Sequence, residues 1–289
     1  MARFFGFVQL DFAGRLTLAD GRYLVREGAS GDESVLVVGT LGTTPMARRR
    51  RRRARGVQEA EPAELALTRV TAIRAFAPFD EEEAAARWLD EATEAEDTVD
   101  VLVGDAVALL NRALHVQAVA ATDPAFQTLS AERAATVRIG YGSGEETADG
   151  RFSAAREVDV ASGASRRRRR EEELRPQARV AAVLGGNEQL DVCETLLLRA
   201  RADLDGGRGR EAALQLQGGL EALLSELRAG PDDEGHNRDM EELGERRGEA
   251  ELVATAAVGG ELTSAQGHEL RELLEICERV LRRRRVLRD

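Results

Sequence analysis

Two charge-dense breaks divide the chain and limit what it can fold into. The first break, residues 43–64, carries seven arginines at Arg48–Arg53 and Arg55. The second, residues 161–176, contains a run of five arginines at Arg166–Arg170, followed directly by three glutamates. Segments of this composition are typical of linkers or exposed loops, so the apolar segments outside them must supply the cores.

Short runs rich in β-branched and aromatic residues, separated by Gly-containing turns, recur before residue 160. This pattern is typical of antiparallel strands, because each run is short and each turn is tight. It predicts strands at residues 3–12, 21–26, 34–40, 65–76, 135–141 and 151–160.

Two helices are expected between the fourth and fifth of these strands. The first should open at Asp80, an N-cap residue with Glu83 at the spacing of a capping box. The second should cover residues 99–121, where apolar residues recur at helical spacing on most sides. We therefore expect this second helix to be buried.

From residue 177 onward the pattern is helical. After a short segment at 177–184, helices are expected from Asn187 to Leu204 and over 208–227. A final helix should begin at a capping box formed by Thr263 and Gln266. Residues 229–250 are polar and Gly-rich, which favours a mobile loop.

The two helices joined at Gly206-Gly207 resemble a tetratricopeptide-type helical hairpin. The resemblance covers only residues 187–227, and no second copy of the repeat is apparent, so it implies one hairpin rather than a solenoid. The residues that carry it lie around the second helix: Gly207, Arg208, Glu211, Ala212, Leu216 and Leu220.

These elements predict an α+β chain. An N-terminal antiparallel-sheet domain with packed helices should occupy residues 1–160. A charged linker follows over 161–176. An all-α, helical-hairpin (TPR-like) domain should occupy residues 177–289.

The absence of lysine excludes several kinds of chemistry. All 41 basic residues are arginine, a bias typical of a GC-rich genome. Without lysine the chain cannot form a P-loop, a Schiff base or the ion pair of a protein kinase. We expect no cofactor.

The thiols and imidazoles give no metal-binding pattern. Cys193 and Cys277 fall on apolar helix faces and are expected as buried free thiols. The three histidines, His115, His236 and His268, have no ligand spacing, and His115 is expected as a core residue. No metal site is predicted.

The chain is expected to remain in the cytoplasm and away from membranes. Its N-terminal apolar segment is interrupted by Gln9 and Asp11 and lacks a small-residue cleavage site. No stretch approaches the roughly eighteen apolar residues of a membrane span. A net charge of −11 also argues against general binding to nucleic acid or anionic lipid.

A Gly-rich segment after the fifth strand is the candidate ligand-binding site. Backbone N–H groups of such a segment can hold a phosphate. The acids that follow oppose an anion, so a plain connection between strands 135–141 and 151–160 is the favoured interpretation. The candidate ligand-binding residues are Arg138, Tyr141, Gly142, Ser143 and Gly144.

The arginine tracts are candidate docking segments, with Arg48, Arg49 and Arg50 as representatives. They could neutralise phosphates of nucleic acid, but no aromatic residues interleave with them to stack on bases. Self-pairing is the favoured alternative, because residues 80–100 contain ten acids and one arginine. A further tract, Arg282–Arg285, ends a helix, where the dipole favours cations.

The final helix carries an apolar stripe spaced for contact with a partner helix. Its candidate partner-binding residues are Leu270, Leu273, Leu274 and Leu281. Packing of this stripe on the hairpin at 187–227 is the alternative.

No catalytic residue is predicted. Asp105 is the one acid whose neighbours suggest burial, and pairing with Arg112 or Arg138 would make it structural. We therefore expect a non-enzymatic interaction or adaptor protein with a protein partner. The alternatives are a small-molecule or nucleotide-binding enzyme centred on residues 138–151, and a nucleic-acid accessory protein. The oligomeric state is left open.

Overall fold

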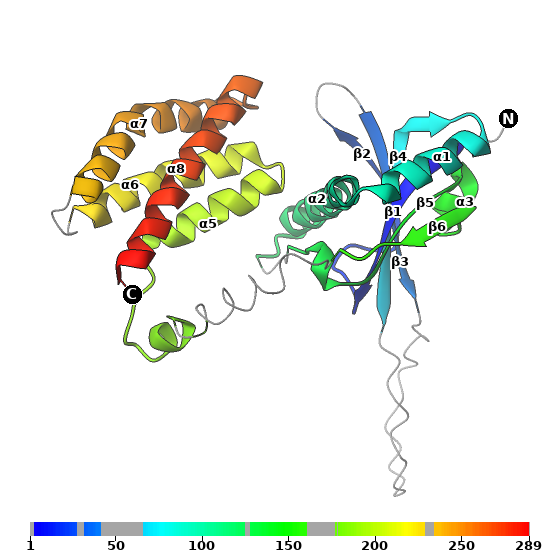
Figure 1. Cartoon of the computed structure of the whole chain (residues 1–289), viewed down its shortest axis with the longest axis horizontal. Helices are drawn as coiled ribbons and strands as arrows, with labels where there is room; N and C mark the ends of the chain where they lie inside the picture. Colours follow the sequence, from blue (N-terminus) through cyan, green and yellow to red (C-terminus); the bar gives the residue numbers. More distant parts are fainter. Residues whose placement is uncertain are drawn as a thin grey trace, which may run out of the picture. The chain divides into compact units, whose positions relative to one another are not determined.

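A computed structural model describes residues 3–27, 32–41, 66–124, 128–160, 177, 179–228 and 234–288. The chain divides into two units, Met1–Gly163 and Ala164–Asp289 (Figure 1). Each unit has its own apolar core. The two units are described separately.

The first unit contains one antiparallel sheet with the strand order β2-β3-β4-β1-β5-β6. The predicted α+β class, an antiparallel sheet followed by helices, is confirmed. The strands are β1 (Phe4–Ala13), β2 (Gly21–Glu27), β3 (Asp32–Leu41), β4 (Leu67–Phe79), β5 (Ala134–Ser143) and β6 (Ala154–Glu157).

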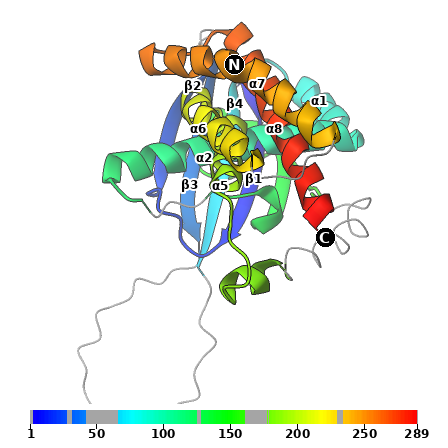
Figure 2. The ribbon, with the colours of Figure 1, turned by 90° about the vertical axis from the view of Figure 1, so that its left-hand side faces the viewer.

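Strand alternation sorts β1 into two faces. Val8, Leu10 and Phe12 belong to the core that the helices α1 (Glu82–Glu94) and α2 (Glu96–Ala121) cover. Figure 2 shows α2 running across the strands. The intervening residues Gln9 and Asp11 point to the opposite face, here called the polar face, and are also buried.

Helix α1 begins later than the sequence suggested. Its N-cap is Glu81, in an extended conformation and without a side-chain cap, so the prediction that Asp80 caps it is wrong. Glu82 and Glu83 lie in the first turn instead. At this position their negative charges interact favourably with the positive end of the helix dipole. This interaction stabilises the start of the helix without a capping side chain.

Helix α2 is buried on one side only, which corrects the expectation of full burial. Leu102, Val103 and Leu110 are buried against the sheet. On the opposite side Val101 is 62% exposed and Val116 59% exposed. A helix lying on a sheet can bury only the side that faces it, so an apolar composition all round leaves apolar residues in solvent.

The described part of the second unit contains four long helices: α5 (Val192–Asp205), α6 (Gly209–Leu227), α7 (Glu234–Gly259) and α8 (Ser264–Arg288). Helices α5 and α6 pack against each other as a helical hairpin, whereas its likeness to a tetratricopeptide repeat stays a prediction. Helix α8 packs against α5, α6 and α7 (Figure 1). In the described part of the chain, no helix has both the length and the hydropathy that a membrane crossing requires.

Of the two helix caps predicted in this unit, one is confirmed and one is wrong. The capping box at Thr263 is confirmed, since its N–H donates to Gln266 Oε1 at 2.9 Å and its Oγ1 accepts from the Gln266 N–H at 3.3 Å. The expected cap at Asn187 is wrong. Helix α5 instead starts at Asp191, which forms a capping box with Glu194.

Helix α7 replaces most of the predicted loop at 229–250, and that prediction is therefore wrong for residues 234–250. Leu243 and Ala250 are buried in the core of this unit. On the polar side of the helix, Arg283 pairs with Asp239 at 3.3 Å and Arg279 with Glu242 at 2.6 Å. These contacts with α8 offset the low helix propensity of the glycines.

The core of the second unit can be tested on one helix. Leu220→Ala removes a side chain that is 1% exposed and should lower the free energy of unfolding by about 2–5 kcal/mol. Leu214→Ala, at a position 45% exposed on the same helix, should cost about 0.5 kcal/mol or less. Urea denaturation followed by circular dichroism measures both, and equal losses would contradict this packing.

Candidate functional site

The residues of the Gly-rich segment do not converge on one site. Strand β5 extends to Ser143, so this segment is strand rather than loop, and Ser143 caps the short helix α3 (Gly144–Ala148). Arg138 lies on the polar face, whereas Tyr141, three residues on, lies in the core under the helices. Strand alternation thus points the two candidate ligand-binding side chains in opposite directions.

Close packing explains the glycines in this segment. A Cβ on Gly140 would lie 2.5 Å from the backbone oxygen of Ala154 and 2.6 Å from the ring of Phe7. A Cβ on Gly142 would lie 2.8 Å from Thr147 Oγ1. The space beside both glycines is occupied by protein atoms, which leaves no cradle for a phosphate at these positions.

Tyr141 is part of the core of the first unit. It is 6% exposed and its ring meets that of Phe4 edge to face, with centroids 6.3 Å apart. Burial, together with the charges of Glu82 and Asp90, raises the pKa of the Tyr141 phenol. The side chain therefore stays neutral and serves packing.

An ion-pair cluster on the polar face uses the one candidate arginine of this segment. Asp11 accepts hydrogen bonds from Arg69 Nε at 2.8 Å, from Arg69 Nη2 at 2.9 Å and from Arg138 Nη1 at 3.0 Å. The two arginine side chains are 27% and 25% exposed, while that of Asp11 is 7% exposed. Arg138 is thus engaged in holding β1 and β5 together.

Among the described residues of the first unit, the buried acid is Asp11, which no sequence pattern singled out. Burial alone would raise the pKa of Asp11, but the hydrogen bonds and charges of Arg69 and Arg138 outweigh it and lower that pKa. The carboxylate therefore stays ionised at neutral pH. A permanently ionised, fully paired acid is a structural group rather than a proton donor.

Asp105 is exposed, and the expectation that it is buried is wrong. It lies on the side of α2 that faces away from the core. In the part of the chain that the structure describes, it forms no ion pair with Arg112 or with Arg138, whose partners are Asp11 and Glu157. Of its apolar neighbours along the helix, Leu109 is buried, whereas Val101 is exposed on the same side as Asp105.

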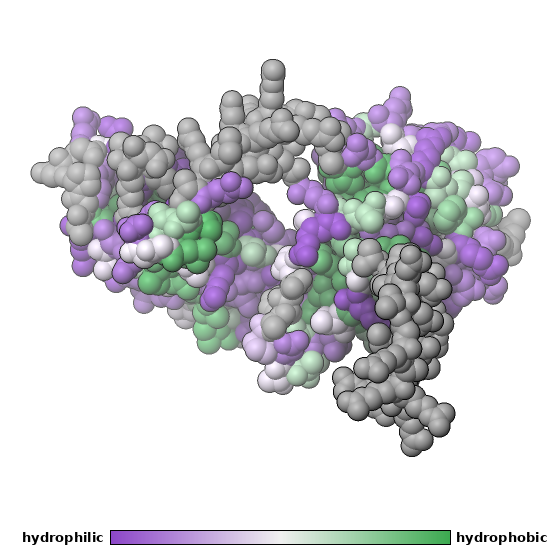
Figure 3. All heavy atoms as spheres, turned by 90° about the horizontal axis from the view of Figure 1, so that it is seen from below, coloured by the Kyte–Doolittle hydropathy of each residue, from purple (hydrophilic) through white to green (hydrophobic). Residues whose placement is uncertain are grey.

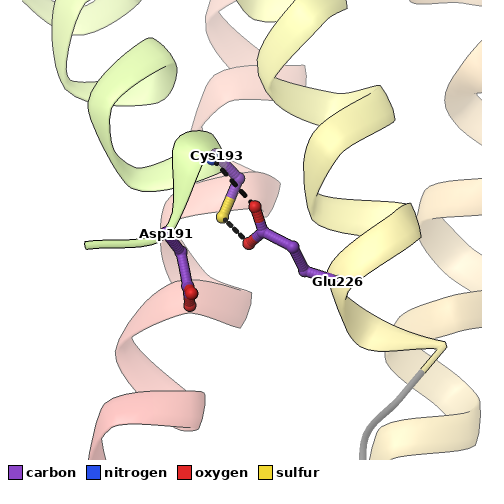
Figure 4. Close-up of side chains that lie close together, drawn as sticks. All are labelled: Asp191, Cys193 and Glu226. Atoms are coloured by element: carbon purple, nitrogen blue, oxygen red, sulfur yellow. Dashed lines mark hydrogen bonds between the residues drawn. The ribbon is translucent and has the colours of Figure 1, made fainter. Parts of the chain in front are cut away.

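In the second unit, Cys193 lies at the centre of a polar cluster (Figure 4). Its thiol donates to Glu226 Oε2 at 2.8 Å, and its backbone N–H donates to Glu226 Oε1 at 3.3 Å. Asp191 lies beside them, and one ligand atom from each of the three residues falls within 4.8 Å of the others. These are atom types that bind Zn²⁺.

Two features make this cluster an internal network as it stands. Arg284 lies 3.6 Å from both Asp191 and Glu226, so a guanidinium already supplies positive charge to the two carboxylates. Burial and the neighbouring Glu226 raise the pKa of the Cys193 thiol, which keeps its proton. No sequence spacing indicated this cluster, because Glu226 on α6 lies 33 residues from Cys193 on α5 and Arg284 comes from α8.

The apolar stripe of α8 lies inside the second unit. Leu270, Leu273, Leu274 and Leu281 are at most 8% exposed and belong to its core. The alternative of packing on the hairpin is therefore the one observed, and this stripe offers no surface to a partner. Of the arginine tracts, Arg48–Arg53 and Arg166–Arg170 lie outside the described residues.

A wide hollow of about 500 Å³ lies between α7 and α8. Its lining is charged and includes Glu242, Arg246 and Arg279. Arg279 pairs with Glu242 at 2.6 Å and Arg246 with Glu249 at 2.7 Å. Each of these charges thus already has a partner within the protein, and the hollow resembles an ordinary charged surface in contact with water.

A second groove, of about 250 Å³, lies in the first unit between α2 and the strands β3 and β4. Its lining is mainly apolar, with Val8, Ala72, Leu102 and Leu109 among its residues. Arg74 and Asp105 are the charged residues of its lining. Its lining also includes Phe76, which is 44% exposed and lies under the Arg74 guanidinium, 5.0 Å from the ring centroid.

Outside this groove, the exposed apolar residues of the described chain lie singly or in small groups. Figure 3 shows such groups set among polar residues on the face in view. The groove is distinguished by its concave shape and by its position beside the exposed side of α2. Comparison with models of protein families, with curated proteins and with solved structures finds no match to this chain.

The Asp11 cluster can be tested with Asp11→Asn. Loss of the charged hydrogen bonds should lower the free energy of unfolding by about 2 kcal/mol at pH 7. Fluorescence of Trp88, the single tryptophan, reports on this unit. The exposed Asp100→Asn is the control and should change that free energy by about 0.5 kcal/mol or less.

The same variant has a defined pH dependence. The pKa of Asp11 is lower in the folded than in the unfolded state. Its stabilisation is therefore complete above the unfolded pKa and is lost as the pH falls through the folded pKa. Between about pH 5 and pH 3, Asp11→Asn should lose less stability than the natural chain, and parallel losses would contradict the assignment.

The two cysteines should be inert in the folded protein. Burial raises the pKa of Cys277 to about 12, and burial with Glu226 raises that of Cys193. Since the thiolate is the reactive form, an aromatic disulfide reagent should label neither thiol until urea is added. Leu198→Cys, at a position 71% exposed, should react at once. Rapid labelling of either native thiol would contradict this arrangement.

Proposed function

We propose that this chain is a non-enzymatic protein-interaction protein whose first unit binds a helix of another protein chain along α2. The single observation that carries the proposal is the apolar groove beside the exposed side of α2. A volume of about 250 Å³ suits one or two anchoring side chains, whereas small-molecule sites usually enclose about 300–1,000 Å³.

The chemistry of the groove favours an amphipathic protein segment as the ligand. The apolar lining can accept an aliphatic or aromatic anchor, and Arg74 and Asp105 can pair with charges of both signs. The neighbouring Val101, 62% exposed, extends the apolar surface along α2. A helix laid beside α2 would bury these residues together, as in other helix-in-groove complexes.

The arrangement of buried polar groups gives less support to an enzyme. Asp11 is fully engaged by two arginines, and Cys193 donates to Glu226. Packing fills the space beside Gly140 and Gly142, which weakens the alternative of a ligand site at 138–151.

A photoreactive phenylalanine analogue in place of Phe76 tests the proposal. The chain has no lysine, so ordinary amine-reactive cross-linkers would label it poorly. In extract from the source cells, the analogue at Phe76 should cross-link to a defined peptide of a protein chain. The same analogue at Phe152, 42% exposed but away from the groove, is the matched control.

A second substitution connects the cross-link to α2. Val101→Arg adds a charge beside the groove and should reduce the cross-link at Phe76 at least about tenfold. Val258→Arg, at a position 68% exposed in the second unit, should leave it unchanged. Equal cross-linking at Phe76 and Phe152, or an undiminished cross-link in Val101→Arg, would contradict the proposed function.

A further inference from the structure

The outward side of α2 carries a stripe of residues at helical spacing, here called the α2 stripe. Val101, Asp105, Arg112 and Val116 are exposed on it, and Ala108 is half-buried. Gly104, also exposed, lies at its edge. Successive members are three or four residues apart, which places them along one side of a helix. No described element of the first unit covers this stripe.

Gly104 has no role in the packing of the described monomer. A Cβ at this position would meet no atom within 4 Å, and the residue is not among those with positive φ. Glycine inside a helix costs about 0.8–1 kcal/mol relative to alanine. Together with Ala108, one turn later, it makes a shallow place where a second helix can approach closely.

The stripe carries two opposite charges that a second helix could pair with. Asp105 and Arg112 form no ion pair within the described part of the chain. They lie seven residues apart, or about 10.5 Å along the helix, so they cannot reach each other. A matching helix must bring a cation opposite Asp105 and, about two turns away, an anion opposite Arg112.

We infer that the helix which fits the α2 stripe is α2 of a second copy, packed antiparallel. This inference rests on the proposed function and names its partner. A two-fold axis level with the gap between residues 108 and 109 places Asp105 opposite Arg112 of the second copy. The same axis places Val101 opposite Val116 of the second copy and brings the two Ala108 residues to the crossing point.

The two-fold symmetry gives every charge and valine of the α2 stripe a partner on the second copy. Because the contact is between identical surfaces, each ion pair and each valine contact occurs twice. A parallel arrangement would instead place Asp105 opposite Asp105 and Arg112 opposite Arg112, which repel. The charge order along the stripe therefore selects the antiparallel form.

The expected association is of modest strength. One pair of helices buries less than the roughly 1,200 Å² of a standard stable complex. Dimers should accordingly form and dissociate reversibly, and they should be sought at tens of micromolar protein. Sedimentation equilibrium of the purified full chain measures the dissociation constant directly.

Charge reversal provides the test. Asp105→Arg and Arg112→Asp should each weaken self-association at least about tenfold. Mixed in equal amounts, the two variants should form a heterodimer with an affinity within about threefold of the natural one, because both ion pairs are then restored. Asp100→Arg makes the same charge change about 140° away around the helix and should leave the affinity unchanged.

The outcomes separate this inference from the proposed function. A natural chain that remains monomeric up to about 100 μM overturns the inference, and so does a mixture of the two variants that fails to associate. If the chain is monomeric while Val101→Arg still abolishes a cross-link from Phe76 to another protein, the proposed function stands and the second copy is excluded as the partner.

Discussion

The packing of α2 against the sheet is the interaction on which the rest of this account depends. Helix α2 has apolar residues on more than one side, and the sheet accepts only the side that bears Leu102, Val103 and Leu110. Because α2 packs on the sheet in this orientation, Val101 and Val116 face the solvent. A groove lies between α2, β3 and β4. The proposed contact with another molecule would cover this groove and the exposed valines beside it.

Arginine provides the ion pairs that hold buried or half-buried carboxylates in both units. Its planar fork matches a carboxylate with two parallel hydrogen bonds, as Arg69 does with Asp11 and Arg201 with Glu278 at 2.7 and 2.9 Å. A chain in which all 41 basic residues are arginine can therefore satisfy its buried acids efficiently. Within the described residues, Asp105 and Arg112 of the α2 stripe take no part in this pairing.

Local patterns predicted the secondary structure, whereas long-range contacts decided the sites. The strands of the sheet and the capping box at Thr263 depend on neighbours in sequence, and both were predicted correctly. Asp11 meets its arginines from 58 and 127 residues away, which no spacing rule could reveal. The helix over 234–250 was missed because contacts with α8 outweigh its glycines. The exposure of Asp105 depends on which side of α2 the sheet covers.

The most direct test of self-pairing through α2 is the distance between spin labels in a mixture of identical chains. A label at Asp100→Cys lies outside the α2 stripe, and the native thiols are buried. Residue 100 is 8.5 residues from the inferred axis, so the 1.5 Å rise per residue places two labels about 25–30 Å apart. A distance distribution centred there supports antiparallel pairing, and the absence of any distance between copies at about 100 μM contradicts it.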